Sequence, residues 1–224
     1  LEDGKCLTIW DATTDGHIKN GDDAKIACDH YHRYQDDIDL LKQIGTNCYR
    51  FSISWARIFT DQNTVNPKGI EFYNKVIDKL IQNGIQPMVT LFHWDLPMWA
   101  YNQGGWKNPQ IVEWFANYTK VVVEAFSDRV KYWITLNEPQ CFIGLGYKSG
   151  SQAPFEKNTP AQLQDITINV MYTHGKAVDT IRKYAKQKPL IGYAPTSSTI
   201  VPKSDNASDV EFARKETFNI DRTG

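Results

Sequence analysis

The chain has 224 residues, of which 41% are apolar, and a formal net charge of −1 at pH 7. This balanced charge argues against a nucleic-acid-binding protein, which presents a basic surface, and no run of about 20 apolar residues predicts a membrane span. We expect one α/β unit with a large core and neither nucleic acid nor membrane as a partner. No secretory leader pattern is visible, which favours a cytoplasmic protein, although the start Leu1-Glu2-Asp3-Gly4 has no Met and resembles a chain interior.

Helical and strand patterns alternate along the chain after a polar, loop-like N-terminal stretch. Apolar residues at helical spacing predict helices, and short apolar runs bounded by Gly or Pro predict strands. The expected helices are 36–45, 67–84, 108–129, 163–187 and 209–220. The expected strands are 48–55, 86–93, 130–138 and 189–195. This alternation predicts a parallel sheet with right-handed helical crossovers.

Two architectures fit this alternation, a doubly wound open sheet and a TIM barrel. Gly144-Leu145-Gly146 lacks the third glycine of a dinucleotide-binding fingerprint, so nothing supports a nucleotide cofactor. Polar and aromatic residues follow three successive strands: Ser54 and Trp55, then His93 and Trp94, then Asn137 and Glu138. Because catalytic groups of TIM barrels sit at the carboxyl ends of the strands, this arrangement favours the barrel.

The segment Thr135-Leu136-Asn137-Glu138-Pro139 closes the third predicted strand. Pro139 has no N–H and cannot continue the strand, so Asn137 and Glu138 lie where the backbone stops pairing. A carboxyl, an amide, an imidazole and indoles on one rim suit a sugar, with Glu138 as a general acid for a glycosidic oxygen. The alternative is an ordinary exposed carboxylate at a strand end.

Several blocks of sequence resemble glycoside hydrolase family 1, the β-glucosidase family, in order and spacing. These blocks are Asp29-His-Tyr-His-Arg-Tyr34, Tyr49-Arg-Phe-Ser-Ile-Ser-Trp55, Gly69-Ile-Glu-Phe-Tyr-Asn74, Val89-Thr-Leu-Phe-His-Trp-Asp-Leu-Pro97, Gly104-Gly-Trp106 and Trp133-Ile-Thr-Leu-Asn-Glu-Pro139. The resemblance implies a TIM barrel, a retaining β-glycosidase and a β-glucoside or oligosaccharide substrate, without a metal or cofactor.

The resemblance also implies a role for each matching residue. Glu138 matches the general acid/base, and Asn137 matches the residue that bonds the 2-hydroxyl of the sugar. His93 and Trp94 match groups that line the site of the non-reducing sugar. Arg50 matches the arginine that lies under the nucleophile, where a guanidinium favours an ionised carboxylate.

The chain also departs from the family pattern, since members are roughly twice as long. A first strand carrying a sugar-binding Gln, and the strand with the nucleophilic glutamate in a Thr-Glu-Asn-Gly motif, would lie outside these residues. Gln140 stands where many relatives carry a Trp that stacks on the leaving group. We therefore expect residues 1–224 to form the N-terminal half of a barrel, about four βα units of eight. Such a chain would be inactive alone, and a second half or a second copy would close the fold.

Two other functions stay open. One is a non-catalytic half-barrel that assembles with itself or with a second fragment, and the other is a 6-phospho-β-glucosidase. The intact His93-Trp-Asp-Leu-Pro97 segment argues against the phospho-glycosidase, and Glu138 argues against a thioglucosidase, in which Gln replaces the acid.

Three further features have structural interpretations. Asp95 is expected to cap backbone N–H groups. The loop from Trp99 to Trp106 is either a substrate platform or a roof of the barrel. His30 and His32 are not expected to bind a metal, because positions i and i+2 of a helix point apart.

Overall fold

The computed structural model describes residues 1–218 of the chain. Four parallel strands form one sheet in the order β1-β2-β3-β4, so each strand pairs with its neighbour in sequence. The strands are β1 (Cys48–Ser52), β2 (Gln86–Phe92), β3 (Tyr132–Asn137) and β4 (Leu190–Ala194). A doubly wound sheet reverses its strand order at a switch point. The uninterrupted order observed here is that of a barrel segment, which resolves the two architectures left open by the sequence.

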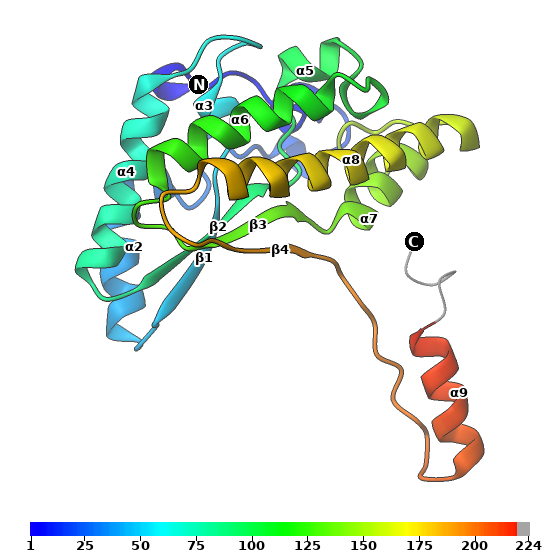
Figure 1. The fold of residues 1–224 in the computed structure, drawn as a ribbon. Coiled ribbons are helices and arrows are strands. Elements are labelled where there is room, and N and C mark those ends of the chain that lie inside the picture. The colour runs from blue at the N-terminus through cyan, green and yellow to red at the C-terminus, as the bar shows by residue number, and fades with distance from the viewer. Residues whose placement is uncertain (219–224) are drawn as a thin grey trace.

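The long helices cover one face of this sheet and leave the other face open (Figure 1). They are α2 (His30–Gln43), α4 (Pro67–Gln82), α6 (Ile111–Phe126) and α8 (Pro160–Tyr184). The last three connect successive strands, so the chain repeats a βα unit. The shorter helices are α1 (Ile9–Ala12), α3 (Trp55–Ile58), α5 (Met98–Asn102), α7 (Pro139–Cys141) and α9 (Ala207–Thr217), with 3₁₀ turns η1 (Glu2–Gly4), η2 (Lys19–Gly21), η3 (Gly105–Lys107) and the π-helical η4 (Phe142–Lys148).

Local sequence explains where the connecting helices begin. Asn66 caps α4 by accepting a hydrogen bond from the Lys68 N–H at 3.2 Å, and Pro67 occupies the first helical turn. Thr159 and Gln162 form a reciprocal capping box at the start of α8. These caps satisfy N–H groups that would otherwise lack partners, so both helices start at defined residues.

The hydrophobic core lies between the sheet and its helical cover. The buried side chains of the core include Ile77, Val89, Leu91, Phe115, Tyr118, Val122, Trp133, Val170 and Ile181. The indoles of Trp55, Trp106 and Trp133 are among the largest fully buried groups. Burial of large apolar side chains contributes about 1.5–3 kcal/mol each, so this core holds the helices against the sheet.

The N-terminal segment runs beside the chain that leaves β2. Ile9 N–H donates to the Leu96 carbonyl at 2.9 Å, and Met98 N–H donates to the Leu7 carbonyl at 2.8 Å. A predicted loop therefore contains short helices whose position is set by long-range backbone hydrogen bonds.

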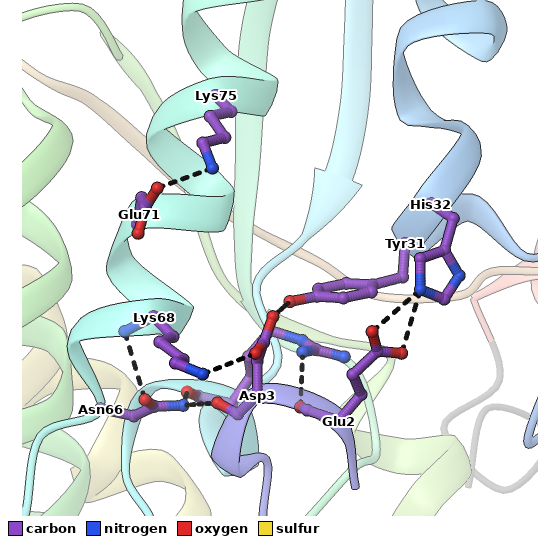
Figure 2. A network of polar contacts seen from close by, with 9 residues as sticks. Glu2, Asp3, Tyr31, His32, Asn66, Lys68, Glu71 and Lys75 are labelled. Carbon is purple, nitrogen blue, oxygen red and sulfur yellow. Dashed lines mark hydrogen bonds and ion pairs between the residues drawn. The ribbon is translucent and has the colours of Figure 1, made fainter.

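A polar cluster joins the first residues to two helices (Figure 2). The Asp3 carboxylate accepts hydrogen bonds from the Tyr31 hydroxyl at 2.6 Å and from Lys68 Nζ at 2.9 Å. Asn66 Nδ2 donates to the Asp3 carbonyl at 2.8 Å. The turn η1 is thus held against the beginnings of α2 and α4.

Two predicted boundaries are wrong for reasons of tertiary structure. The helix predicted over 36–45 begins at His30, so its acidic residues lie inside α2, where Asp37 bonds His30 Nδ1 at 2.6 Å. The strand predicted over 48–55 ends at Ser52, because Trp55 starts α3 and turns its indole into the core. Burial of one large ring outweighs a continued strand pattern.

Beyond β4 the chain leads away from the body of the molecule to α9 (Figure 1). The helix predicted over 209–220 is α9, and the end of that predicted range lies outside the described residues. Of the helices within residues 1–218, none combines the length and apolar character needed to span a lipid bilayer.

Candidate active site

The predicted site residues come from three adjacent strands. Arg50 lies within β1, His93 and Trp94 follow β2, and Asn137 ends β3 just before Glu138. Because the strands are parallel and neighbouring, their carboxyl ends meet at one edge of the sheet.

Asn137 is the centre of the hydrogen bonds at this edge. Its Oδ1 accepts from Arg50 Nη2 at 2.5 Å, and its Nδ2 bonds His93 Nε2 at 3.0 Å. Its backbone carbonyl accepts from Trp94 Nε1 at 2.9 Å. Asn137 is only 3% exposed, so these bonds hold it in one orientation. The structure therefore connects Arg50, His93 and Trp94 through a single residue.

Thr90 supports this arrangement from β2. Its hydroxyl accepts a hydrogen bond from Arg50 Nε at 3.1 Å, and the residue is buried. With Thr90 and Asn137 both as acceptors, the guanidinium of Arg50 lies across two strands. Reasoning from sequence missed Thr90, because an isolated Thr inside a strand carries no signal of its partner.

The electrostatics of His93 favour a neutral ring. Partial burial lowers the pKa of His93, the positive charge of Arg50 lowers it further, and the charge of Glu138 opposes both effects. An amide nitrogen can only donate, so His93 Nε2 accepts from Asn137 and the ring proton of the neutral form is assigned to Nδ1.

Glu138 has an unusual backbone conformation, with φ 45° and ψ 60°. Trp94 is also left-handed, with φ 75°. Residues other than glycine rarely adopt this conformation, and it clusters at functional sites. The Glu138 N–H donates to the Ala194 carbonyl at 2.7 Å, which attaches the turn to the end of β4.

The side chain of Glu138 is partly exposed and uncommitted. Within residues 1–218 its carboxylate takes part in no hydrogen bond or ion pair. Its charge acts on His93 and on the Cys141 thiol, whose pKa is raised by burial and then by Glu138. A partly exposed carboxylate with neither a hydrogen bond nor an ion pair among the described residues is available for a ligand.

A cavity of about 660 Å³ adjoins this edge. Arg50, Thr90 and His93 contribute to its wall on the open face of the sheet. The wall of the cavity also includes residues of α2 and α4, among them Leu41 and Phe72. Its size falls in the range of small-molecule sites.

At Trp106 the loop after β2 forms a roof of the barrel and does not expose its ring as a platform for a substrate. Its ring is 1% exposed and packs against Phe92 and Phe142, with ring centroids 5.2 and 5.4 Å away.

His30 and His32 bond different carboxylates, Asp37 and Asp29, each at 2.6 Å. Trp10, from the segment predicted to be a loop, donates from Nε1 to the Trp94 carbonyl at 3.2 Å.

Comparison with known proteins indicates the same family as the sequence motifs, along almost the whole chain. Residues 1–223 match the model of glycosyl hydrolase family 1. A 1,4-β-D-glucan glucohydrolase from Thermotoga neapolitana is 41% identical over 217 residues, which are 96% of this chain and 51% of that protein. Beta-glucosidase 40 from Arabidopsis thaliana is 41% identical over 95% of this chain and 45% of its own length.

Solved structures agree with these relatives. A family 1 β-glucosidase from Thermotoga maritima in complex with isofagomine lactam superposes with a TM-score of 0.88 at 40% identity, covering 98% of this chain and 50% of that chain. The four βα units thus align with half of a TIM barrel, and the chain spans about half the length of the curated relatives it matches. By this likeness over almost all of its residues, the chain belongs to glycosyl hydrolase family 1.

Proposed function

We propose that the protein containing this chain is a retaining β-glycosidase of the β-glucosidase type, with Glu138 as general acid/base. The observation that carries the proposal is the uncommitted Glu138 carboxylate beside Asn137, which is itself held by Arg50 and His93. Residues 1–224 would supply the acid half of the site as the N-terminal half of a barrel. Family membership and the β-glucosidase relatives support the substrate class.

In the first step Glu138 would donate its proton to the glycosidic oxygen as the bond to the aglycone breaks. A carboxylate nucleophile, from a part of the protein outside these residues, would attack the anomeric carbon and form a glycosyl-enzyme. Glu138, now ionised, would then take a proton from water as the water displaces the enzyme. The positive charge of Arg50 would favour the ionised nucleophile.

The remaining residues would bind the sugar. The Asn137 side chain has two N–H groups and gives one to His93, so the second is left for a hydroxyl such as the 2-hydroxyl. Neutral His93 keeps an Nδ1–H donor for another hydroxyl. Trp94 gives its N–H to Asn137, so its ring face is what it offers to the C–H face of a sugar.

The test is Glu138→Gln in the full-length protein. We expect cellobiose hydrolysis to fall by about 10²–10⁴-fold, because a poor leaving group needs the acid. An activated p-nitrophenyl β-glucoside should still form the glycosyl-enzyme, and azide, which needs no general base, should restore its turnover. Glu113→Gln, a change of the same kind at an exposed ion pair with Lys176, is the control. Unchanged cellobiose hydrolysis by Glu138→Gln would show that the assignment of Glu138 is wrong.

The same measurements address the alternatives. A full-length protein that binds glucosides but cleaves none would favour the non-catalytic alternative, in which the half-barrel assembles with itself or with a second fragment. Cleavage restricted to 6-phosphorylated glucosides would favour the phospho-glycosidase. Turnover by a purified 25.7 kDa chain, with intact mass confirming no other polypeptide, would contradict the need for a second half.

A further inference from the structure

Trp10 makes a hydrogen bond to the loop of the sugar site, and the mechanism above does not use it. Its indole Nε1 donates to the Trp94 carbonyl at 3.2 Å, although the two residues are 84 positions apart. An indole carries a single polar hydrogen, so this bond occupies the whole hydrogen-bonding capacity of the Trp10 side chain. The rest of the ring is partly buried against the hydrophobic core. Trp10 is therefore held by packing and directed at one carbonyl oxygen.

The backbone beside Trp10 is attached to the same loop independently of that bond. Residues 7–9 pair with residues 96–98 through two backbone hydrogen bonds of 2.8 and 2.9 Å. The side chain of Ile9, next to Trp10, is only 3% exposed. Because these contacts place α1 without help from the indole, loss of the indole N–H alone should leave the backbone of α1 where it is.

Trp94 has a backbone conformation that needs support from its surroundings. Its left-handed φ of 75° costs about 1–2 kcal/mol for a residue with a Cβ, and such a residue keeps this conformation only where neighbouring groups hold it. The cap expected from Asp95 is not formed by its Oδ1, which is shielded from solvent and has no hydrogen-bond partner within residues 1–218. The support that the structure shows comes from other segments of the chain.

Two hydrogen bonds hold Trp94 at its opposite ends. Trp10 donates to its carbonyl, and its own indole Nε1 donates to the Asn137 carbonyl at 2.9 Å. Among the described residues 1–218, no other group donates to the Trp94 carbonyl. The direction of a carbonyl follows the backbone dihedral ψ of its residue, so the bond from Trp10 constrains the backbone of Trp94, whereas the bond to Asn137 constrains its ring.

We propose that Trp10 is a positioning residue whose indole N–H holds the left-handed turn at Trp94 and thereby keeps the Trp94 ring against Asn137. The kinetic consequence rests on the proposed function, in which the face of that ring packs on a sugar. The geometric consequence does not, because it concerns the conformation of Trp94 alone.

The proposal predicts how the two kinetic constants divide. A ring that only packs on the sugar binds the substrate and the transition state about equally, so its displacement should raise KM and leave kcat nearly unchanged. A displaced Trp94 ring should also bond the Asn137 carbonyl less well, which makes the Trp94 indole N–H exchange faster with solvent. A residue that merely filled space would change the melting temperature without either effect.

The experiment uses Trp10→Phe in the full-length protein, because phenylalanine keeps an aromatic ring and lacks the N–H. The matched control is Trp114→Phe in α6, where the ring packs on Trp99 with centroids 5.7 Å apart and the indole makes no hydrogen bond within residues 1–218. We expect Trp10→Phe to raise KM for p-nitrophenyl β-glucoside about tenfold, one decade being about 1.4 kcal/mol of lost binding.

Hydrogen exchange in D₂O, followed by NMR, gives a second measurement that needs no substrate. The Trp94 indole N–H, assigned by its disappearance in Trp94→Phe, should exchange about tenfold faster in Trp10→Phe than in the wild type. The control Trp114→Phe should change neither this rate nor KM, although it too loses part of a packed ring.

A lower melting temperature of Trp10→Phe, with KM and Trp94 exchange as in the wild type, would overturn the proposal, because Trp10 would then be a packing residue only. Equal effects of Trp114→Phe would overturn it as well. If the full-length protein cleaves no glycoside, the proposed function fails, while Trp94 exchange still decides the role of Trp10. If Trp10→Phe does not fold, the wild type decides: exchange of the Trp10 indole N–H slower than that of Trp114 supports the hydrogen bond, and equal rates contradict it.

Discussion

Arg50 and Asn137 are 87 positions apart in the sequence, yet Arg50 Nη2 lies 2.5 Å from Asn137 Oδ1. The hydrogen bond crosses from β1 to β3 and passes over β2, where Thr90 accepts from the same guanidinium. It determines which end of the Asn137 amide faces His93, since the oxygen is already occupied by Arg50. The orientation of the proposed sugar-binding amide thus depends on a charged residue two strands away.

This relationship predicts coupled effects of substitution at Asn137 and Arg50. We expect Asn137→Ala to lower kcat/KM of the full-length protein for β-glucosides by about 10²–10³-fold, as for loss of a preorganised donor. Arg50→Lys should also lower it, because an ammonium group lacks the planar fork that reaches Thr90 and Asn137 together. The double variant should lose less than the product of the single losses. Independent, multiplicative losses would contradict the coupling.

His93 should remain neutral at pH values where an ordinary histidine is half protonated. Its pKa is lowered from 6.5 by partial burial and by Arg50. The folded protein therefore binds fewer protons than the unfolded chain, and its stability should decrease as the pH falls below 6.5. Long-range ¹H–¹⁵N NMR of the imidazole should find the proton on Nδ1. A proton on Nε2 at neutral pH would contradict the assigned hydrogen bond from Asn137.

The contact between α3 and α4 should make Gly69 sensitive to substitution. A Cβ at this position would collide with the Arg57 carbonyl, a backbone atom that cannot move aside cheaply. We expect Gly69→Ala to destabilise the protein by about 3 kcal/mol, as for an overpacked core site. Gly175→Ala in α8 is the control, because its Cβ would meet no atom within 4 Å.

Gly175→Ala should stabilise the protein by about 0.5–1 kcal/mol through helix propensity. Chemical denaturation of both variants measures the difference. Equal effects of the two alanines would show that α3 and α4 do not approach as closely as described.

Asn66 joins the N-terminal turn to α4, as Figure 2 shows. Replacing it should therefore lower the stability of the protein more than replacing a polar residue on the surface. Its Nδ2 donates to the Asp3 and Arg57 carbonyls at 2.8 and 2.9 Å, and its Oδ1 caps α4. We expect Asn66→Ala to cost about 1–3 kcal/mol, because it removes a cap and takes the donor away from two carbonyls in a partly buried setting. Asn63→Ala, in the exposed turn nearby, is the control. If both substitutions shift the denaturation midpoint equally, the hydrogen bonds of Asn66 do not contribute the stability expected of them.

Much of this protein could be predicted from local sequence. The alternation of helices and strands was confirmed for all four βα units, because apolar periodicity reflects which faces are buried. Asn137 and Glu138 were placed correctly at a strand end, since Pro139 prevents further pairing. The boundaries at His30 and Trp55 were wrong, because long-range contacts rather than local pattern set them.

The sequence by itself therefore determined the order of elements, the family and the residue types at the candidate site. Only the tertiary structure decided that Asn137 joins Arg50, His93 and Trp94, that Thr90 and Trp10 support them, and that Asp95 carries a shielded carboxyl oxygen. The reason is physical: periodicity records burial along one element, whereas hydrogen bonds between strands depend on the register and twist that bring distant residues within about 3 Å.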